Sequence, residues 1–227
     1  MSHRSFVLTL SVAFACWWIG FAFGPYDRSA WLLENALSLI AVAVLAATYR
    51  RFPLSRISYL LIFLFLGLHT LGAHYTYSKV PYDAWWQSLF GATLNEQLGW
   101  ERNHFDRFIH FAYGALLVYP VREVFLRIAG VRGFWGYFLP LDLTMSTSML
   151  YELIEWAAAL LFGGDLGAAY LGTQGDEWDA HQDMALASLG GMISVCAIAL
   201  FNSRTSRDFA YEWVESLRVK IPDPPGE

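Results

Sequence analysis

The sequence predicts an all-α protein, a polytopic transmembrane helix bundle of about six spans. Of its 227 residues, 56% are hydrophobic and only 15% are charged, whereas about 25% of the residues in soluble domains are charged. The apolar residues gather in blocks of about 20, the length that a helix needs to cross a bilayer. Such blocks must be helical in lipid, because each backbone polar group needs a partner within its own segment.

The first expected span covers residues 5–24, because the apolar run continues through Trp17 and Trp18 past the point where a signal peptide would be cleaved. The other expected spans are residues 30–49, 57–77, 105–129, 134–162 and 182–202. Residues 1–202 therefore form one integral membrane bundle without a separate soluble domain. Cys16 and Cys196 lie within apolar runs, which favours ordinary packing over a disulfide.

Two segments outside the spans are amphipathic. Residues 81–86 are rich in Trp and Tyr, which favours an outer helix lying in the membrane interface. Residues 203–227 predict a cytoplasmic amphipathic helix, with Phe209 and Trp213 on its apolar side, followed by a disordered tail.

The basic residues predict the orientation. If both termini are cytoplasmic, only four of the 15 Lys and Arg residues lie outside: Arg28, Lys79, Arg102 and Arg107. This bias is the positive-inside pattern of multi-pass plasma-membrane proteins. The net charge of −5 is concentrated at the outer end, which argues against nucleic acid and leaves membrane lipids, or a small-molecule or lipid ligand, as the expected partners.

Ionisable residues at the outer ends of the spans are the candidate functional groups, because charges are costly within a membrane. Asp106 and His110 are four residues apart and share one helical stripe, which Arg102 and Arg107 flank. A carboxylate one turn from an imidazole can orient it, raise its basicity or share a metal with it. The alternative is an interfacial histidine that makes one interhelical hydrogen bond.

Glu152 and Glu155 lie within the fifth expected span, about 10 Å from its end at 1.5 Å per residue. Two close carboxylates in an apolar bundle need a cation, or one of them carries a proton. Arg102, Arg107 or a metal is the candidate cation. A buried Glu–Arg pair that only fixes helix packing is the competing interpretation.

His69 and His74 end the third expected span. They are five residues apart, so a regular helix directs them about 140° from each other. Each is a candidate metal ligand, but both reach one ion only if the helix frays. Hydrogen bonding to a neighbouring helix is the alternative role.

Asp176, Asp179 and Asp183 are spaced to project from one side of the last span. Capping of the helix N-terminus explains one or two of them. Three acids without a local basic residue suggest a divalent metal, with oxygen ligands favouring Mg or Ca and added histidines favouring Zn or Mn. His181 points away from Asp179 and is excluded. The spacing matches none of the common metal or nucleotide motifs.

Four ordered motifs carry a family resemblance: residues 69–77, 102–110, 151–156 and 171–184. They resemble the YjdF-type bacterial inner-membrane family over nearly the whole chain, except the tail after about Asn202. The resemblance implies a multi-pass protein of the bacterial inner membrane and implies no reaction. The chain departs from the family pattern at His181, where that pattern has Gln.

Three functions are open. The first is a metal-dependent membrane enzyme acting on a lipid or another amphiphile. Its chemistry would come from Glu152, Glu155, Asp106, His110, Arg102 and Arg107, and its metal ligands from Asp176, Asp179, Asp183, His69 and His74. The second is a cation or proton transporter, which requires polar residues along the inner half, where Asp142 stands out. The third is a non-catalytic scaffold with a closed interhelical network.

Overall fold

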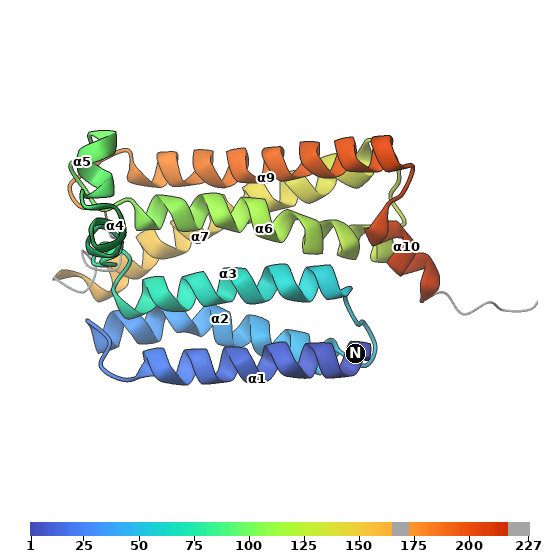
Figure 1. The fold of residues 1–227 in the computed structure, drawn as a ribbon, viewed down its shortest axis with the longest axis horizontal. Coiled ribbons are helices and arrows are strands. Elements are labelled where there is room, and N and C mark those ends of the chain that lie inside the picture. The colour runs from blue at the N-terminus through green and yellow to red at the C-terminus, as the bar shows by residue number, and fades with distance from the viewer. Residues whose placement is uncertain (165–172, 218–227) are drawn as a thin grey trace, which may run out of the picture.

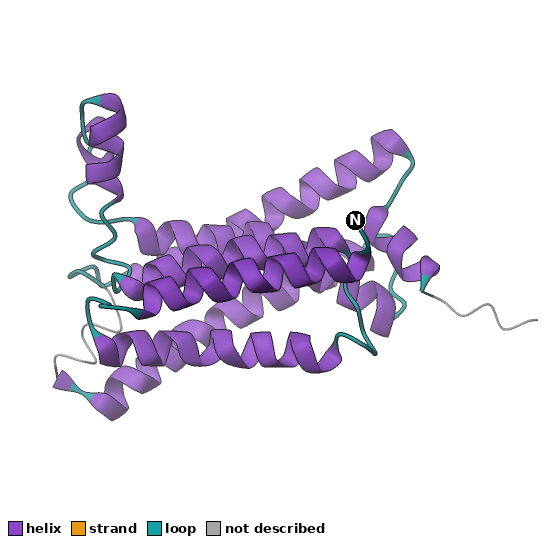
Figure 2. Ribbon diagram, turned by 60° about the horizontal axis from the view of Figure 1, so that its bottom comes forward, coloured by secondary structure: helices purple, strands orange, loops and turns teal. Residues whose placement is uncertain are grey.

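The computed structural model describes residues 1–164 and 173–217, and all regular structure in these residues is helical (Figure 2). In the described residues, six long helices form a bundle (Figure 1). They are α1 (His3–Ala22), α2 (Arg28–Thr48), α3 (Arg56–His74), α6 (Phe105–Ile128), α7 (Trp135–Phe162) and α9 (Asp179–Thr205). The expected all-α class is confirmed.

Five of these helices are long and apolar enough to cross a membrane: α1, α2, α3, α6 and α9. Helix α7 has 28 residues and is about 42 Å long at 1.5 Å per residue. It does not reach the same apolar composition, because Asp142, Glu152 and Glu155 interrupt it. The sixth span therefore remains a prediction.

The third expected span extends too far. Helix α3 ends at His74, and Thr76 and Tyr77 adopt positive φ angles of 51° and 50°. Tyr77 folds back against the helix at Gly72, where an added Cβ would lie 2.4 Å from the Tyr77 ring. This reversal places the Tyr77 hydroxyl inside the bundle, where an extended helix would have directed it elsewhere.

The shorter helices lie at the two ends of the bundle. Helices α4 (Tyr82–Phe90) and α5 (Leu94–Leu98) lie at the end where α6 and α9 begin (Figure 1). Helix α10 (Phe209–Ser216) lies at the opposite end, within the expected C-terminal segment. The expected disordered tail falls largely on residues 218–227, which lie outside the described part of the chain.

Helix α3 joins the two halves of the bundle, because it packs against α1 on one side and α6 on the other. Helix α2 packs against α3, and no extensive contact joins it to α7 in the described residues. The second half consists of α6, α7 and α9, each of which packs against the other two.

Helices α6 and α9 make the most intimate contact in the bundle. A Cβ added to Gly114 would lie 1.8 Å from the backbone oxygen of Ala187, and one added to Gly190 would lie 2.2 Å from that of Phe111. Such backbone contact requires small residues, which commonly join helices in membranes. It sets the N-terminal turns of α6 and α9 side by side.

At the opposite end, two buried charges of α6 hold the loops and α10. Arg122 donates to both carboxylate oxygens of Asp208, at 2.9 and 2.5 Å. Glu123 accepts from the Ser55 backbone N–H at 2.7 Å and from the Ser58 hydroxyl at 2.5 Å. The sequence reasoning overlooked Glu123, which is a structural group fixing the start of α3.

Replacing Gly114 with Ala should destabilise the bundle, because the added methyl group collides with the α9 backbone. Overpacking of this kind costs about 1–3 kcal/mol, so the purified protein should unfold at a lower temperature in detergent. Gly67→Ala is the matched control, since nothing lies within 4 Å of a Cβ built there. Equal melting temperatures for the two variants would contradict this account of the α6–α9 contact.

Candidate functional site

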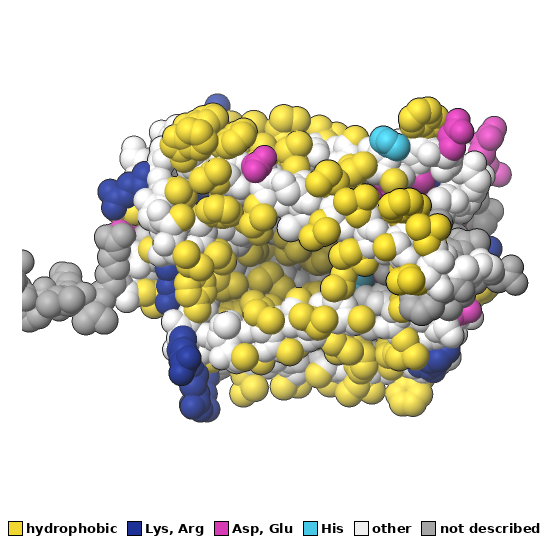
Figure 3. Space-filling view, turned by 180° about the vertical axis from the view of Figure 1, so that it is seen from behind, with side chains coloured by type: hydrophobic (Ala, Val, Ile, Leu, Met, Phe, Trp, Pro, Cys, Tyr) yellow, Lys and Arg dark blue, Asp and Glu magenta, His cyan; other side chains and the backbone are white. Residues whose placement is uncertain are grey.

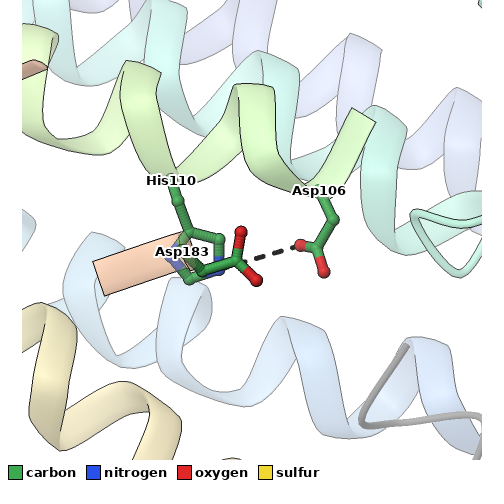
Figure 4. A group of neighbouring side chains, drawn as sticks. All are labelled: Asp106, His110 and Asp183. Atoms are coloured by element: carbon green, nitrogen blue, oxygen red, sulfur yellow. Dashed lines mark ion pairs between the residues drawn. The ribbon is translucent and has the colours of Figure 1, made fainter. Parts of the chain in front are cut away.

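Four ionisable side chains converge where α6, α7 and α9 meet: Asp106, His110, Glu152 and Asp183, here called the acid–histidine cluster. His110 Nε2 lies 3.4 Å from Glu152 Oε1 and 3.8 Å from Asp106 Oδ1. One ligand atom each from Asp106, His110 and Asp183 lies within 4.8 Å of the other two. Figure 4 shows these three side chains directed into the same space.

Each member of the cluster is placed by the element that carries it. Asp106 and His110 lie one turn apart on α6, as their spacing predicts. Asp183 lies in the second turn of α9, which the glycine contact holds against α6. Helix α7 is fixed nearby by a 2.6 Å hydrogen bond between the Tyr113 and Thr147 hydroxyls, five residues before Glu152.

A second tier of acids lies beside the cluster. Tyr151 donates a 3.0 Å hydrogen bond to Glu34 Oε2 of α2. Glu155 lies one helical turn after Tyr151 on α7. The sequence reasoning predicted Glu155 but missed Glu34, which is only 5% exposed. An acid within the apolar run 30–49 was the signal that could have identified it.

His69 and His74 have separate roles in the structure. His69 Nδ1 lies 2.5 Å from the Tyr77 hydroxyl, and its Nε2 lies 3.1 Å from the Glu34 backbone oxygen. A carbonyl only accepts, so Nε2 carries the proton. His74 Nδ1 bonds the Phe21 backbone oxygen at 2.8 Å. The two rings diverge as expected, and His74 joins α3 to α1 away from the cluster.

The two arginines pair with two of the predicted metal ligands. Arg102 Nη1 lies 2.8 Å from Asp179 Oδ1 and 3.4 Å from Asp176 Oδ2. Arg107 Nη2 contacts Asp176 and lies 3.5 Å from Asp179 Oδ1. We call these four residues the outer clasp. The expected trio of aspartates is therefore divided, since Asp176 and Asp179 face guanidinium groups and Asp183 faces the cluster.

The outer clasp also orders the segment before α9. Arg102 Nη1 donates to the Thr173 backbone oxygen at 2.9 Å. The Asn103 backbone N–H donates to Gln174 Oε1 at 3.1 Å, and Gln174 Nε2 donates to the Asn103 backbone oxygen at 2.9 Å. These bonds hold residues 173–178 against the start of α6. His181 is exposed and stacks its ring edge-on against Trp178 outside the clasp.

The electrostatics of the clasp follow from its contacts. A hydrogen bond from the Trp178 backbone N–H lowers the pKa of Asp176, and the Arg107 and Arg102 guanidinium groups act in the same direction. Burial lowers the pKa of His104, helped by the positive charges of Arg107 and Arg102. Near neutral pH Asp176 is therefore ionised and His104 neutral.

An apolar cavity of about 630 Å³ begins at the acid–histidine cluster and extends between α2, α3, α6 and α7. His69, Asp106, His110 and Tyr151 line its polar end. The remaining walls are almost wholly aliphatic and aromatic, including Leu45, Leu54, Leu117, Val121, Val124 and Ile154. Figure 3 shows this face of the molecule hollowed between the helices and lined by hydrophobic side chains. We call the cavity the α2–α7 groove.

Comparison with known proteins agrees with the resemblance seen in the sequence. Residues 6–204 match the family described as "Predicted membrane protein (DUF2238)". The chain is 40% identical over 185 residues to "Inner membrane protein YjdF" of Escherichia coli (strain K12), covering 81% of this chain and 84% of that relative. No solved structure matches. Together with the apolar helices, the relative supports a multi-pass inner-membrane location. The chain belongs to the DUF2238 family of predicted membrane proteins.

Proposed function

We propose that this protein is a membrane-embedded enzyme that acts on a lipid or another amphiphile. The headgroup would lie at the acid–histidine cluster and the apolar chain in the α2–α7 groove. One observation carries the proposal: a groove that is otherwise apolar ends at a cluster of acids and a histidine. Its volume of about 630 Å³ lies within the range of about 300–1,000 Å³ typical of ligand pockets.

The way into the site favours a substrate that resides in the membrane. The outer clasp holds residues 173–178 across the ends of α6 and α9. The groove, in contrast, is exposed on the face between α2 and α7, which do not pack extensively against each other. An amphiphile can therefore enter sideways from the bilayer, whereas a water-soluble substrate would have to displace the clasp.

Acid–base catalysis is the chemistry that the cluster supports best. His110 lies between two carboxylates, Asp106 and Glu152, and this group of acids can supply or accept a proton at the headgroup. Glu155 would act from the second tier. Arg102 and Arg107 would bind an anionic headgroup: Arg102 Nε and Nη2 and Arg107 Nε are buried and have no hydrogen-bond partner among the described residues.

The alternatives gain less support. Transport needs polar groups along the inner half of a path, but that part of the groove is apolar, and neither Asp142 nor Glu123 lines it. A closed scaffold needs satisfied polar groups. Ser148 Oγ, Glu152 Oε1 and Asp183 Oδ1 are instead buried without a hydrogen-bond partner in the described residues. Buried polar groups of this kind call for a ligand, ion or water.

The proposal includes six spans with both termini in the cytoplasm. Helix α7 would be the sixth span, because it packs against α6 and α9 (Figure 1) and its Glu152 lies beside His110 of α6. Basic side chains gather mainly at one end and acidic ones mainly at the other (Figure 3), as the positive-inside pattern requires. Helices α4 and α5 would then lie at the outer interface and α10 at the cytoplasmic surface.

Filling the groove should expel a bound amphiphile. Leu117→Trp places an indole in the groove wall, so the purified variant should retain several-fold less lipid than the unaltered protein by native mass spectrometry. Leu189→Trp is the matched control, since Leu189 is 42% exposed on α9 and does not line the groove. Equal lipid retention by both variants would contradict binding in the groove.

Replacing the carboxyl group of Glu152 or Glu155 with an amide should abolish turnover while leaving binding intact. General acid–base catalysis contributes about 10²–10⁴-fold, so Glu152→Gln and Glu155→Gln should each lower turnover at least a hundredfold. The measurement uses cells from which the chromosomal gene has been deleted. It compares the inner-membrane lipid profile after supplying either the unaltered gene or a variant. Asp142→Asn is the control. If both Glu variants fold and restore the unaltered profile, the enzyme proposal is wrong.

The topology predicts which positions reach the outside of intact cells. With Cys16 and Cys196 replaced by Ser, a single cysteine at Ser88 should react with a membrane-impermeant thiol reagent. Single cysteines at Ser2 and Ser206 should react only after the membrane is opened. If one of the cysteines at Ser2 and Ser206 reacted in intact cells and the other did not, the number of spans between them would be odd.

A further inference from the structure

We propose that Asp106, His110 and Asp183, with Glu152 as a fourth ligand, bind one divalent transition-metal ion. The binding site stands on geometry alone, whereas a catalytic role for the metal rests on the proposed function. The ligand set differs from the one that the sequence suggested, because it retains only Asp183 of the five predicted metal ligands and takes its other members from α6 and α7.

The spacing of the donor atoms suits a single ion. Ligands about 2.1 Å from a tetrahedral metal lie about 3.4 Å from one another. His110 Nε2 and Glu152 Oε1 are 3.4 Å apart, and His110 Nε2 and Asp106 Oδ1 are 3.8 Å apart. Asp183 supplies an oxygen within 4.8 Å of the chosen atoms of Asp106 and His110. Side-chain rotations of Asp183 and Glu152 would bring their oxygen atoms to about 3.4 Å from the other ligand atoms and close the set around an ion.

Two buried oxygen atoms provide independent support. Asp183 is 2% exposed, and its Oδ1 has no hydrogen-bond partner in the described part of the chain. Glu152 Oε1 is likewise buried without one, and its side chain is 9% exposed. Native proteins rarely leave buried carboxylate oxygens unpaired unless an ion or water occupies the site.

The acid–histidine cluster contains more carboxyl groups than basic side chains. The two arginines of the clasp pair with Asp176 and Asp179. No Lys or Arg among the described residues forms an ion pair with Asp106, Asp183 or Glu152. Three carboxyl groups thus surround one imidazole, and a divalent ion would supply the missing positive charge.

The ligand types select the metal. Ca²⁺ and Mg²⁺ prefer oxygen alone, whereas one imidazole among carboxylates suits Zn²⁺ or Mn²⁺. Cys16 and Cys196 are exposed on α1 and α9 and contribute no thiolate to the site. Ser148 lies one turn before Glu152 and lines the groove beside His110, so its buried hydroxyl can bond a metal-bound water or carboxylate. Four protein ligands complete a tetrahedral shell, so a catalytic role for the metal requires a fifth coordination position on the groove side.

The test is direct metal analysis of the full-length protein in detergent. After stripping with a chelator and dialysis against Zn²⁺ or Mn²⁺, the protein should hold about one ion per chain by mass spectrometry of the elements. X-ray absorption at the metal edge should detect oxygen and one imidazole, without sulfur. A protein that stays metal-free with both ions, or a spectrum with sulfur ligands, would overturn the proposal.

Variants assign the ion to these residues. Asp183→Asn and His110→Gln should each lower the bound metal at least tenfold while the protein remains monodisperse. His181→Gln and Asp142→Asn are matched controls that lie outside the cluster and should keep the ion. Unchanged metal in Asp183→Asn and His110→Gln would show adventitious binding and overturn the site.

Lipid retention in the stripped protein separates this proposal from the function proposed above. Metal binding without any amphiphile would leave the ion site standing and remove the enzyme proposal. A protein that binds neither ion but retains an amphiphile and turns it over would overturn the ion site and leave the enzyme proposal standing.

Discussion

The backbone contact between α6 and α9 is the constraint on which the site depends. Because Gly114 and Gly190 have no side chains, the two helices meet at distances that no other residue allows. This contact fixes the axial register of Asp183 relative to Asp106 and His110. A shift of α9 along α6 by one turn, about 5.4 Å, would move the α9 carboxylates away from their partners on α6 and disrupt both the cluster and the outer clasp.

The bundle handles its buried charges in two ways. In the clasp, and where Arg122 meets Asp208, acids face guanidinium groups in near-matched numbers. In the cluster and its second tier, acids outnumber bases, and hydrogen bonds from Tyr151 and contacts with His110 are their main partners. Matched pairs hold segments together, whereas the unmatched acids lie at the end of the groove. The difference distinguishes the acids that already face a guanidinium group from those that do not.

Much of the helical framework could be predicted from the sequence, since apolar blocks of fixed length and the i, i+4 spacing of Asp106 and His110 depend only on local geometry. The divergence of His69 and His74 is equally local. The pairing of Asp176 with Arg107 could not be predicted, because it depends on how closely two distant helices approach. Glu34 was overlooked as a single acid in an apolar run, although its depth makes it exceptional.

Helix α2 is held chiefly by α3, and this one-sided packing links access to chemistry. Glu34 on α2 accepts from Tyr151 of α7 through its side chain and bonds His69 of α3 through its backbone oxygen. Any outward tilt of α2 that widens the groove also stretches the bond between Glu34 and Tyr151. If an amphiphile binds as proposed, its arrival would therefore lengthen the contact between Glu34 and Tyr151, so that occupancy changes the hydrogen bonding of the site.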